Sequence, residues 1–260
     1  MLLAIDCGNT NIVFALYDGQ TSLGEWRIET NQGRTADEYT AWLSHLLSLK
    51  ELALKMIDDV IIASVVPVVT EHLIRFSQNH LTCTPMIVGD SAVKLGVSVD
   101  IDMPTQVGAD RLVNAHAAAN MAELPAIILD FGTATTFDLI KKGNVYAGGV
   151  IAPGIALSVQ ALSQAAARLP EIEVAAFGAD LPVIGRDTQA AMRSGIFWGY
   201  VAMIEGVIAR ITKQENEDLE VIATGGLAHL FAPHIPVISK VDSELTMRGL
   251  LQIYSMNKVS

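Results

Sequence analysis

The sequence predicts an α/β fold made of two related halves, and an internal repeat is the first observation that predicts it. One short apolar run ends at Asp6 and another ends at Asp130. Each run is typical of a buried strand that ends in a tight turn and is followed by a second apolar run. Aligning Asp6 with Asp130 also aligns, without a gap, Gly8 with Gly132 and Gly19 with Gly143. The sequence pattern of one strand–loop–strand hairpin therefore occurs twice, about half a chain apart.

The composition and the hydrophobic pattern are the other two observations. Hydrophobic residues make up 51% and charged residues 17% of the 260 residues, which is enough apolar material for a sizeable core. Apolar runs of strand length alternate with amphipathic stretches of helix length, a pattern typical of sheets that carry helices. We expect two halves that share a cleft, residues 1–122 with the first hairpin and residues 123–260 with the second.

In the first half, further elements are predicted from local patterns. They are strands over 22–29, 59–66 and 85–88, and helices over 35–50, from Pro67 onward and over 112–121. The helix at 35–50 has a defined start, because Thr35 and Glu38 have the spacing of a capping box. Residues 89–99 follow no pattern and are expected to be irregular.

In the second half, elements are predicted in the same way. They are a strand over 144–151, helices over 155–169 and 188–213, a strand over 220–223, a short helix after the turn at 224–228, and a closing helix over 243–256. Residues 170–184 contain Pro170 and Pro182 and predict either a loop or a flap. The aromatic cluster at 197–200 favours a core or subunit interface over a platform for a ligand.

The two glycine loops have a chemical use. Glycine lets a backbone approach a ligand closely. Successive backbone N–H groups can cradle phosphate oxygens. Four hydroxyl side chains lie just downstream of the glycines and can add to such a cradle: Thr10, Thr133, Thr135 and Thr136.

The strand-ending Asp6 and Asp130 imply a metal ion if both face one polyphosphate. A carboxylate is repelled by phosphate unless a cation lies between them, and Mg²⁺ takes most of its remaining ligands from water and phosphate. The alternative is that Asp-x-Gly is a common turn at the end of a strand. Either copy alone favours the turn, whereas two copies in one register favour a phosphate site.

Asp110 has two interpretations of equal weight from its spacing alone. It falls in or just before the first turn of the predicted Ala-rich helix, where the helix dipole favours a carboxylate. Alternatively it is a base that accepts the proton of a substrate hydroxyl. The neighbouring Arg111 can hold a substrate carboxylate or keep Asp110 ionised.

Bulk properties and absent motifs exclude several classes of protein. The net charge of −11 argues against a nucleic-acid partner. The two cysteines, Cys7 and Cys83, provide no disulfide framework and fit a reducing compartment. No apolar run reaches about 18 residues and no signal peptide is indicated, so we expect no membrane span and a cytoplasmic protein. The absence of GxxxxGK[ST], GxGxxG and HExxH leaves the paired loops to hold phosphate.

Six motifs together resemble those of a known family. They are Asp6-x-Gly-Asn-Thr10, Val107-Gly-Ala-Asp-Arg111, Asp130-Phe-Gly-Thr-Ala-Thr-Thr136, Gly148-Gly-Val-Ile-Ala-Pro-Gly154, Gly185-Arg-Asp-Thr188 and Ala223-Thr-Gly-Gly226. The paired loops resemble those of the acetate and sugar kinase, Hsp70 and actin superfamily. The whole set is similar to type III pantothenate kinases and spans nearly the whole chain. The resemblance implies duplicated ribonuclease H-like (actin-like ATPase) domains with a nucleotide cleft between them.

The resemblance also implies roles for individual residues. It implies Asp110 as the catalytic proton acceptor. It implies an ATP site made of Asp6, Cys7, Gly8, Asn9, Thr10, Asn11, Ile12, Val13 and Thr133. It implies a substrate site made of Gly108, Ala109, Asp110, Arg111 and Thr188. Asp6 and Asp130 would carry Mg²⁺, Asp130 would lie by a monovalent cation (K⁺ or NH₄⁺), and the glycines at 225–226 would lie beside the adenosine.

The implied reaction is ATP-dependent phosphorylation of the primary hydroxyl of pantothenate to 4′-phosphopantothenate, the first step toward coenzyme A. The resemblance also implies a homodimer. A rival hypothesis is a non-catalytic nucleotide-binding regulator of the same fold, and another is a sugar kinase or phosphatase of the superfamily. Several family members carry Tyr where this chain has Ile101, which affects substrate packing rather than the activity.

Overall fold

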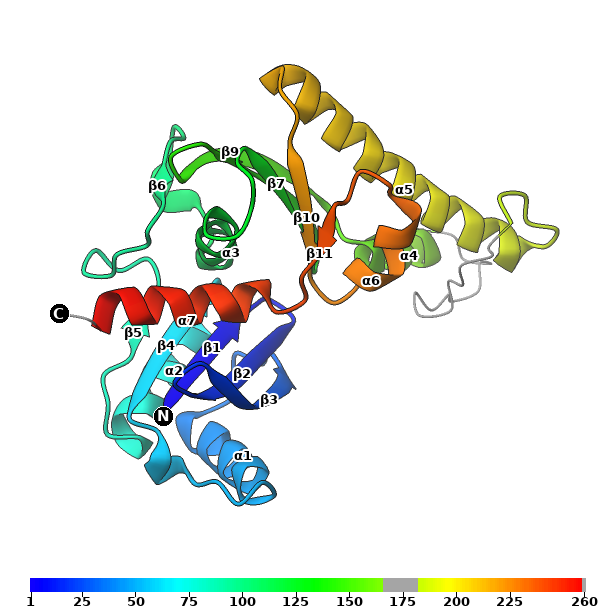
Figure 1. Cartoon of the computed structure of the whole chain (residues 1–260). Helices are drawn as coiled ribbons and strands as arrows, with labels where there is room; N and C mark the ends of the chain where they lie inside the picture. The colour runs from blue at the N-terminus through cyan, green and yellow to red at the C-terminus, as the bar shows by residue number, and fades with distance from the viewer. Residues whose placement is uncertain (166–181, 259–260) are drawn as a thin grey trace. The chain divides into compact units, whose positions relative to one another are not determined.

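The computed structural model describes residues 1–165 and 182–258, and it divides into two compact units. Unit 1 consists of Met1–Asn120 together with Glu244–Ser260, and unit 2 is Met121–Ser243. Both units are built on a mixed β-sheet with helices, in agreement with the α/β class expected from the sequence (Figure 1). The predicted loop or flap at 170–184 lies mostly outside the described residues.

Unit 1 contains a sheet in the order β3-β2-β1-β4-β5. Its strands are β1 (Leu2–Cys7), β2 (Asn11–Asp18), β3 (Thr21–Glu29), β4 (Asp59–Ser64) and β5 (Met86–Ile87). The strands β1, β2 and β3 pair antiparallel, whereas β4 pairs parallel with β1 and β5. The other elements are α1 (Ala36–Ser48), η1 (Leu54–Met56), α2 (Pro67–His80), β6 (Ser98–Val99), η2 (Pro104–Gln106), α3 (Ala109–Ala119) and α7 (Leu245–Lys258).

The central strand β1 is buried on both of its faces. Leu3 and Ile5 point into a core formed with α1 and α2, while Leu2 and Ala4 point into a second core formed with α3 and α7. Side chains alternate along a strand, so this division follows directly from the continuous apolar run. Full burial of one such aliphatic side chain contributes roughly 1.5–3 kcal/mol. The two helical layers therefore hold β1 in a single register.

The C-terminal helix α7 belongs to unit 1, which differs from the division expected at residue 122. Its apolar side packs on the face of the sheet that α3 also covers. Polar contacts anchor its last turn: the Tyr254 hydroxyl donates to Asp59 Oδ2 at 2.8 Å, and Lys258 also pairs with Asp59. Burial by itself would raise the pKa of Asp59, but the bonds from Lys258 and Tyr254 hold it below its ordinary value. These contacts bind the end of α7 to the first residue of β4.

Unit 2 contains strands in the order β11-β10-β7-β8-β9. Their bounds are β7 (Ala126–Phe131), β8 (Ala134–Lys141), β9 (Val145–Pro153), β10 (Glu220–Thr224) and β11 (Lys240–Val241). The strand β7 pairs antiparallel with β8 and parallel with β10, as β1 pairs with β2 and β4. Its helices are α4 (Ile155–Ala165), α5 (Thr188–Glu215), α6 (Ala228–Phe231) and η4 (Ala232–His234).

The helix α5 packs one side on the sheet of unit 2. Phe197, Val201 and Ile204 belong to one core together with Ile127 and Leu129, and Phe197 also stacks on Phe231. Among the described helices, α5 alone is long and apolar enough to cross a membrane, with a mean hydropathy of 1.3 over 18 residues. One such helix is weak evidence for a membrane, because the core helix of a protein without a membrane span passes the same test. Of the 18-residue window in α5, 28% is buried.

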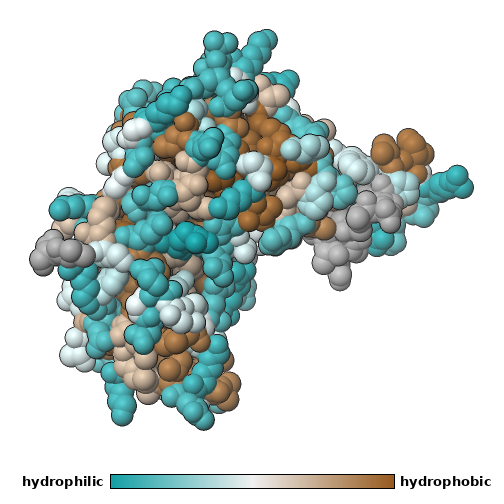
Figure 2. All heavy atoms as spheres, viewed as in Figure 1, coloured by the Kyte–Doolittle hydropathy of each residue, from teal (hydrophilic) through white to brown (hydrophobic). Residues whose placement is uncertain are grey.

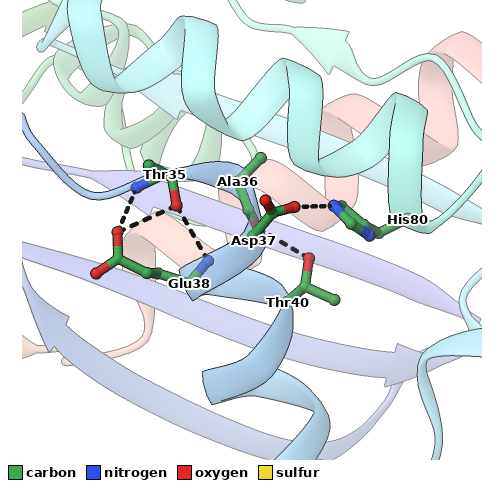
Figure 3. A network of polar contacts seen from close by, with 6 residues as sticks. All are labelled: Thr35, Ala36, Asp37, Glu38, Thr40 and His80. Atoms are coloured by element: carbon green, nitrogen blue, oxygen red, sulfur yellow. Dashed lines mark hydrogen bonds and ion pairs between the residues drawn. The ribbon is translucent and has the colours of Figure 1, made fainter.

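The helix α1 begins at the capping box that the sequence predicts (Figure 3). The Glu38 N–H donates to Thr35 Oγ1 at 3.3 Å, and the Thr35 N–H donates to Glu38 Oε2 at 2.8 Å. In the same first turn, Asp37 Oδ1 lies 2.9 Å from Nε2 of His80 in the last turn of α2. These contacts satisfy the first N–H groups of α1 and join the two helices on the same side of the sheet.

Replacing Thr35 by Ala should lower the free energy of unfolding by about 1 kcal/mol, because the first turn of α1 loses its cap. Urea denaturation at constant m-value measures the change. Thr40→Ala is the matched control, since the Thr40 hydroxyl donates to the Ala36 carbonyl inside the same helix and caps nothing. Equal losses in the two variants would contradict the capping role.

Candidate active site

The loop after β1 is held in place by hydrogen bonds to its backbone. Gly8 N–H donates to the Asn11 carbonyl at 3.0 Å, which closes the turn. The Thr30 hydroxyl donates to the Gly8 carbonyl at 2.7 Å, and the Thr30 N–H donates to the Thr10 carbonyl at 2.9 Å. Asn9 and Thr10 lie exposed at the tip. The loop is therefore a fixed backbone that presents an amide and a hydroxyl side chain outward.

Asp6 lies at the carboxyl end of β1, on the same face as Leu2 and Ala4. That face is the one covered by α3 and α7. Its neighbour in the parallel strand β4 is Ala63, whose small side chain leaves room for a partly buried carboxylate. The strand alternation thus directs Asp6 toward the layer that contains Asp110.

Asp110 is the second residue of α3, so both interpretations of its position are compatible with the structure. Its Oδ1 accepts the Arg111 N–H at 2.8 Å, as a carboxylate at a helix start should. Burial nevertheless raises the pKa of Asp110 above its ordinary value, against the opposing effects of that bond and of the Arg111 charge. A carboxylate with a raised pKa is a better proton acceptor than an exposed one.

Val65 joins the first loop to the start of α3 within unit 1. Its N–H donates to the Cys7 carbonyl at 3.1 Å. Its Cγ1 lies 3.3 Å from the position that a Cβ would take on Gly108, the N-cap of α3. The end of β1, the first loop and the helix that carries Asp110 therefore lie at one edge of the sheet.

Three of the other residues expected to bind ATP, Cys7, Ile12 and Val13, have buried side chains. The fourth, Asn11, is exposed. Burial raises the pKa of the Cys7 thiol to about 11, although a hydrogen bond with Ser64 opposes the rise. A contact between these buried residues and a nucleotide would have to use their backbone, and Cys7 is an inert packing residue.

The loop after β7 is one residue shorter than its counterpart. Asp130 pairs with Thr136, whereas Asp6 pairs with Val13. The gapless sequence alignment hides this difference, because the next turn in unit 2, at 142–144, is one residue longer than the turn at 19–20. The Gly132 N–H closes the shorter loop on the Ala134 carbonyl at 3.1 Å, and Thr133 lies exposed at its tip.

Two glycines from separate segments pack against this second loop. A Cβ on Gly154 would lie 2.2 Å from the Thr133 carbonyl oxygen. A Cβ on Gly225, whose φ is +89°, would lie 2.5 Å from Asp130 Oδ1. Only residues without a side chain fit at such distances. The Gly225-Gly226 turn expected beside adenosine thus borders the Asp130 carboxylate.

The expectation that Thr135 helps to cradle phosphate is wrong. Its side chain is fully buried, and its hydroxyl is hydrogen-bonded to the hydroxyl of Tyr200 on α5. Thr136 points to the other face of the strand, where its hydroxyl donates to Asp138 Oδ2 at 3.2 Å. The alternation along β8 decides these directions, and Thr133 is the loop threonine that faces outward.

Thr188 is the first residue of α5, after the N-cap Asp187, whose Oδ1 accepts the Ala190 N–H at 2.8 Å. It lines an open groove of about 540 Å³ together with Leu162, Ala191, Met192, Gly195 and Ile196. Gly185 allows the preceding turn to pack on the helix, since a Cβ there would lie 2.2 Å from the Ala191 nitrogen.

Sequence reasoning missed Thr30, Tyr200 and Gly154 as supports of the loops. Thr30 anchors the first loop, and the other two residues hold the second. Gly154 is the last residue of the motif at 148–154, so the sequence did contain a signal for this residue. Thr30 follows the end of β3 and Tyr200 lies in α5, so both are distant in sequence from the loops they support, and no local pattern identifies them.

The single carboxylates at the strand ends fit Mg²⁺ better than a metal held by protein alone. Among residues 1–165 and 182–258, no group of three or more His, Cys, Asp or Glu side chains is placed to hold an ion. Mg²⁺ is commonly bound by one or two carboxylates together with water and substrate phosphates. Asp130, cradled by Gly225, and Asp6 supply carboxylates of this kind.

Comparisons with known proteins identify relatives over the full length of the chain. A family model described as type III pantothenate kinase matches residues 2–210. A protein named type III pantothenate kinase from Paramagnetospirillum magneticum is 52% identical over 257 residues, 99% of this chain and 98% of the relative. Another of that name from Caulobacter vibrioides is 48% identical over 260 residues, 100% of this chain and 99% of the relative.

Solved structures show the fold. A Baf family transcriptional activator from Campylobacter jejuni has a TM-score of 0.62 and 20% identity, covering 98% of each chain. An N-acetylglucosamine kinase from Porphyromonas gingivalis has a TM-score of 0.53 and 17% identity, covering 100% of each chain. At these identities the likeness shows the fold alone, which is the duplicated ribonuclease H-like fold of actin-like ATPases and sugar kinases.

Iodoacetamide at pH 8 should alkylate Cys83 and leave Cys7 unmodified in the folded protein. With its pKa at about 11, the Cys7 thiol is thiolate in roughly one molecule in a thousand at that pH, and it is also buried. Mass spectrometry of the peptides measures the labelling. Cys83→Ser should take up no label until urea unfolds it, and rapid labelling of Cys7 would contradict the packing role.

Proposed function

The chain belongs to the type III pantothenate kinase family and is a pantothenate kinase, and from that premise we propose how its own residues perform the reaction. The γ-phosphoryl group of ATP passes to the primary hydroxyl of pantothenate, which gives 4′-phosphopantothenate for coenzyme A synthesis. The observation that supports this assignment of roles is the pair of loops in which an aspartate precedes a fixed glycine turn. Phosphoryl transfer asks a protein mainly for positioning and for neutralisation of charge.

The two loops hold the phosphates of ATP. Asn9 and Thr10 at the tip of the first loop, and Thr133 at the tip of the second, donate side-chain and backbone hydrogen bonds to phosphate oxygens. Gly8 and Gly132 allow the phosphates to approach the backbone. The cores beneath both loops keep these donors in place before ATP binds, so little ordering is needed on binding.

Asp6 and Asp130 act on the same triphosphate. Mg²⁺, when bound there, neutralises the charge that develops on the phosphates during transfer. Each carboxylate would hold the ion directly or through water, and neither residue exchanges protons with the substrate. The missing side chain at Gly225 leaves the space that Asp130 Oδ1 occupies.

Asp110 is the proton acceptor. Its carboxylate, which is oriented by the Arg111 N–H bonded to Oδ1, accepts the proton of the pantothenate hydroxyl. As the hydroxyl oxygen bonds to the γ-phosphorus, the bond from phosphorus to the β,γ-bridging oxygen breaks and ADP departs. Burial keeps the carboxylate basic enough for this role.

Arg111, with the backbone at Gly108 and Ala109, binds the acceptor beside the base. A guanidinium pairs well with a carboxylate, and pantothenate carries one. Thr188 adds a hydroxyl at the start of α5. Ile101 occupies the position where several relatives have Tyr, so we expect the pocket to be lined there by an apolar group without a hydroxyl.

The assembly is a cytoplasmic homodimer joined through α5. Figure 2 shows hydrophobic residues at the surface near the start of α5, at the right of the view. Exposed apolar residues near its start include Val183 and Ile184, which are 65% and 79% exposed. The exposed side of the helix carries small residues, Ala191, Gly195, Gly199 and Ala202, over which a second copy can pack closely.

A second candidate function, a nucleotide-binding regulator without catalysis, has one observation in its favour. The Campylobacter jejuni protein is described as a transcriptional activator. Its 20% identity shows the fold alone, whereas relatives near 50% identity are named as kinases. A pure binding protein has no use for a buried base, so Asp110 also favours the enzyme.

Asp110→Asn should lower kcat by roughly 10²–10⁴-fold with little change in ATP affinity, because the amide accepts no proton. In the wild type, kcat/KM should fall as the pH drops through the raised pKa of Asp110, where the base becomes protonated. ADP release measures both, with pantothenate, with a hexose and without an acceptor. Near-normal turnover by the variant, or equal turnover of the hexose, would contradict the assignment.

Replacing K⁺ or NH₄⁺ by Na⁺ at constant ionic strength should slow turnover on the order of tenfold. We propose that a monovalent cation lies by Asp130, where one Mg²⁺ leaves phosphate charge incompletely neutralised, and tenfold corresponds to about 1.4 kcal/mol of lost transition-state stabilisation. The Asp130→Asn variant should turn over at the same rate in K⁺ or NH₄⁺ as in Na⁺. Equal rates in both salts would remove the monovalent cation from the mechanism.

Gly199→Arg should convert a dimer of twice 27.8 kDa into a monomer, as measured by light scattering after gel filtration. Within the described part of the chain, no atom outside the adjacent turns of α5 lies within 4 Å of a Cβ at Gly199, so the substitution fits there but would bury a charge in the proposed interface. Gln214→Arg, exposed at the far end of α5, is the matched control. A wild-type protein that elutes as a monomer would disprove the dimer.

A further inference from the structure

The carboxylate of Asp110 folds back over the residue that precedes its helix. Asp110 Oδ1 accepts the Arg111 N–H at 2.8 Å, which turns the side chain toward the helix start. In this position Oδ1 lies 2.4 Å, and Cγ 3.6 Å, from where a Cβ would be on Gly108. Carbon and oxygen atoms that are not bonded approach to about 3.3–3.6 Å. A side chain at 108 and the present position of the carboxylate therefore exclude one another.

We propose that Gly108 is a positioning residue for the reaction: its missing side chain leaves the space that the Asp110 carboxylate occupies and so fixes where the proton acceptor lies. This inference rests on the proposed role of Asp110 as the base. It assigns to Gly108 an effect that passes through Asp110 and is separate from any contact that its backbone makes with substrate.

The backbone at Gly108 does not itself require glycine. Its φ and ψ are −59° and 143°, values that alanine adopts without strain. This distinguishes Gly108 from Gly225, whose φ of +89° disfavours every other residue. Among the three described atoms nearest to a Cβ at 108, the one that does not belong to Asp110 is Val65 Cγ1 at 3.3 Å, which needs to move only by a few tenths of an ångström. An added methyl group thus acts mainly on the carboxylate.

Displacement of the carboxylate has two consequences for the reaction. A shift of about 1 Å between reacting groups can lower a rate by about 10²-fold, because the base and the hydroxyl no longer meet in line. A carboxylate pushed away from its buried position also regains water. Its pKa would then fall toward the ordinary value, since burial is what raises it.

The test compares Gly108→Ala, Asp110→Asn and the double variant in the full-length protein. Gly108→Ala should lower kcat by roughly 10–10²-fold with the KM for ATP unchanged. The acidic limb of its pH–rate profile should move to lower pH. In the double variant, adding the methyl group to Asp110→Asn should change kcat by less than about twofold, because the group through which it acts is already lost. Gly33→Ala is the matched control, since among the described residues a Cβ there meets only Asn31 Oδ1, at 3.4 Å.

Each other outcome overturns the inference in a distinguishable way. Wild-type turnover by Gly108→Ala, beside an inactive Asp110→Asn, would reject the positioning role and keep the base. An equal loss in the presence and absence of Asp110 would assign Gly108 to substrate contact instead. Failure of Gly108→Ala to fold, seen by circular dichroism, would contradict the fit of alanine to this backbone. Normal turnover by Asp110→Asn would remove the base and, with it, the inference.

Discussion

Burial of a central strand on both faces is the constraint on which each unit depends. The strand β1 sends alternate side chains into two separate cores of unit 1, and β7 is equally buried along its apolar residues. A strand of this kind leaves no place for a charged side chain except its end. Asp6 and Asp130 lie at those ends, and the turns that follow them carry the candidate phosphate donors. The fold thereby produces the polar edge on which the proposed site is built.

The site is shaped as much by missing side chains as by those present. Gly108 leaves the space taken by the carboxylate of Asp110, and Gly225 leaves the space beside Asp130. Gly154 lets the start of α4 contact the second loop. Since rotation of a carboxylate costs little energy by itself, close packing against backbone is an effective way to restrict it. The carboxylates of Asp110, the proposed base, and Asp130, the proposed metal ligand, are thus both restricted by packing against a glycine.

Much of the local structure could be predicted because its causes are local. The capping box at Thr35 and Glu38 places the start of α1 correctly, and Pro67 marks the start of α2. The apolar runs place β1, β4 and β7 to within about two residues. The candidate site residues were recognisable because each motif is a short segment. The role expected of Thr135 was wrong because strand register and the position of Tyr200 decide which threonine faces inward.

Local sequence patterns were enough to predict two hairpins of one pattern, the starts of the main helices, the family and the residues with the right chemistry. Three features depend instead on contacts between distant residues: α7 completes unit 1, the second loop is one residue shorter than the first, and Asp6 shares a face of the sheet with the helix of Asp110. The physical reason is the range of the interactions. Caps, turns and alternation act over a few residues, whereas the contacts of Tyr254 and Lys258 with Asp59 join residues nearly 200 positions apart, between which no local pattern exists.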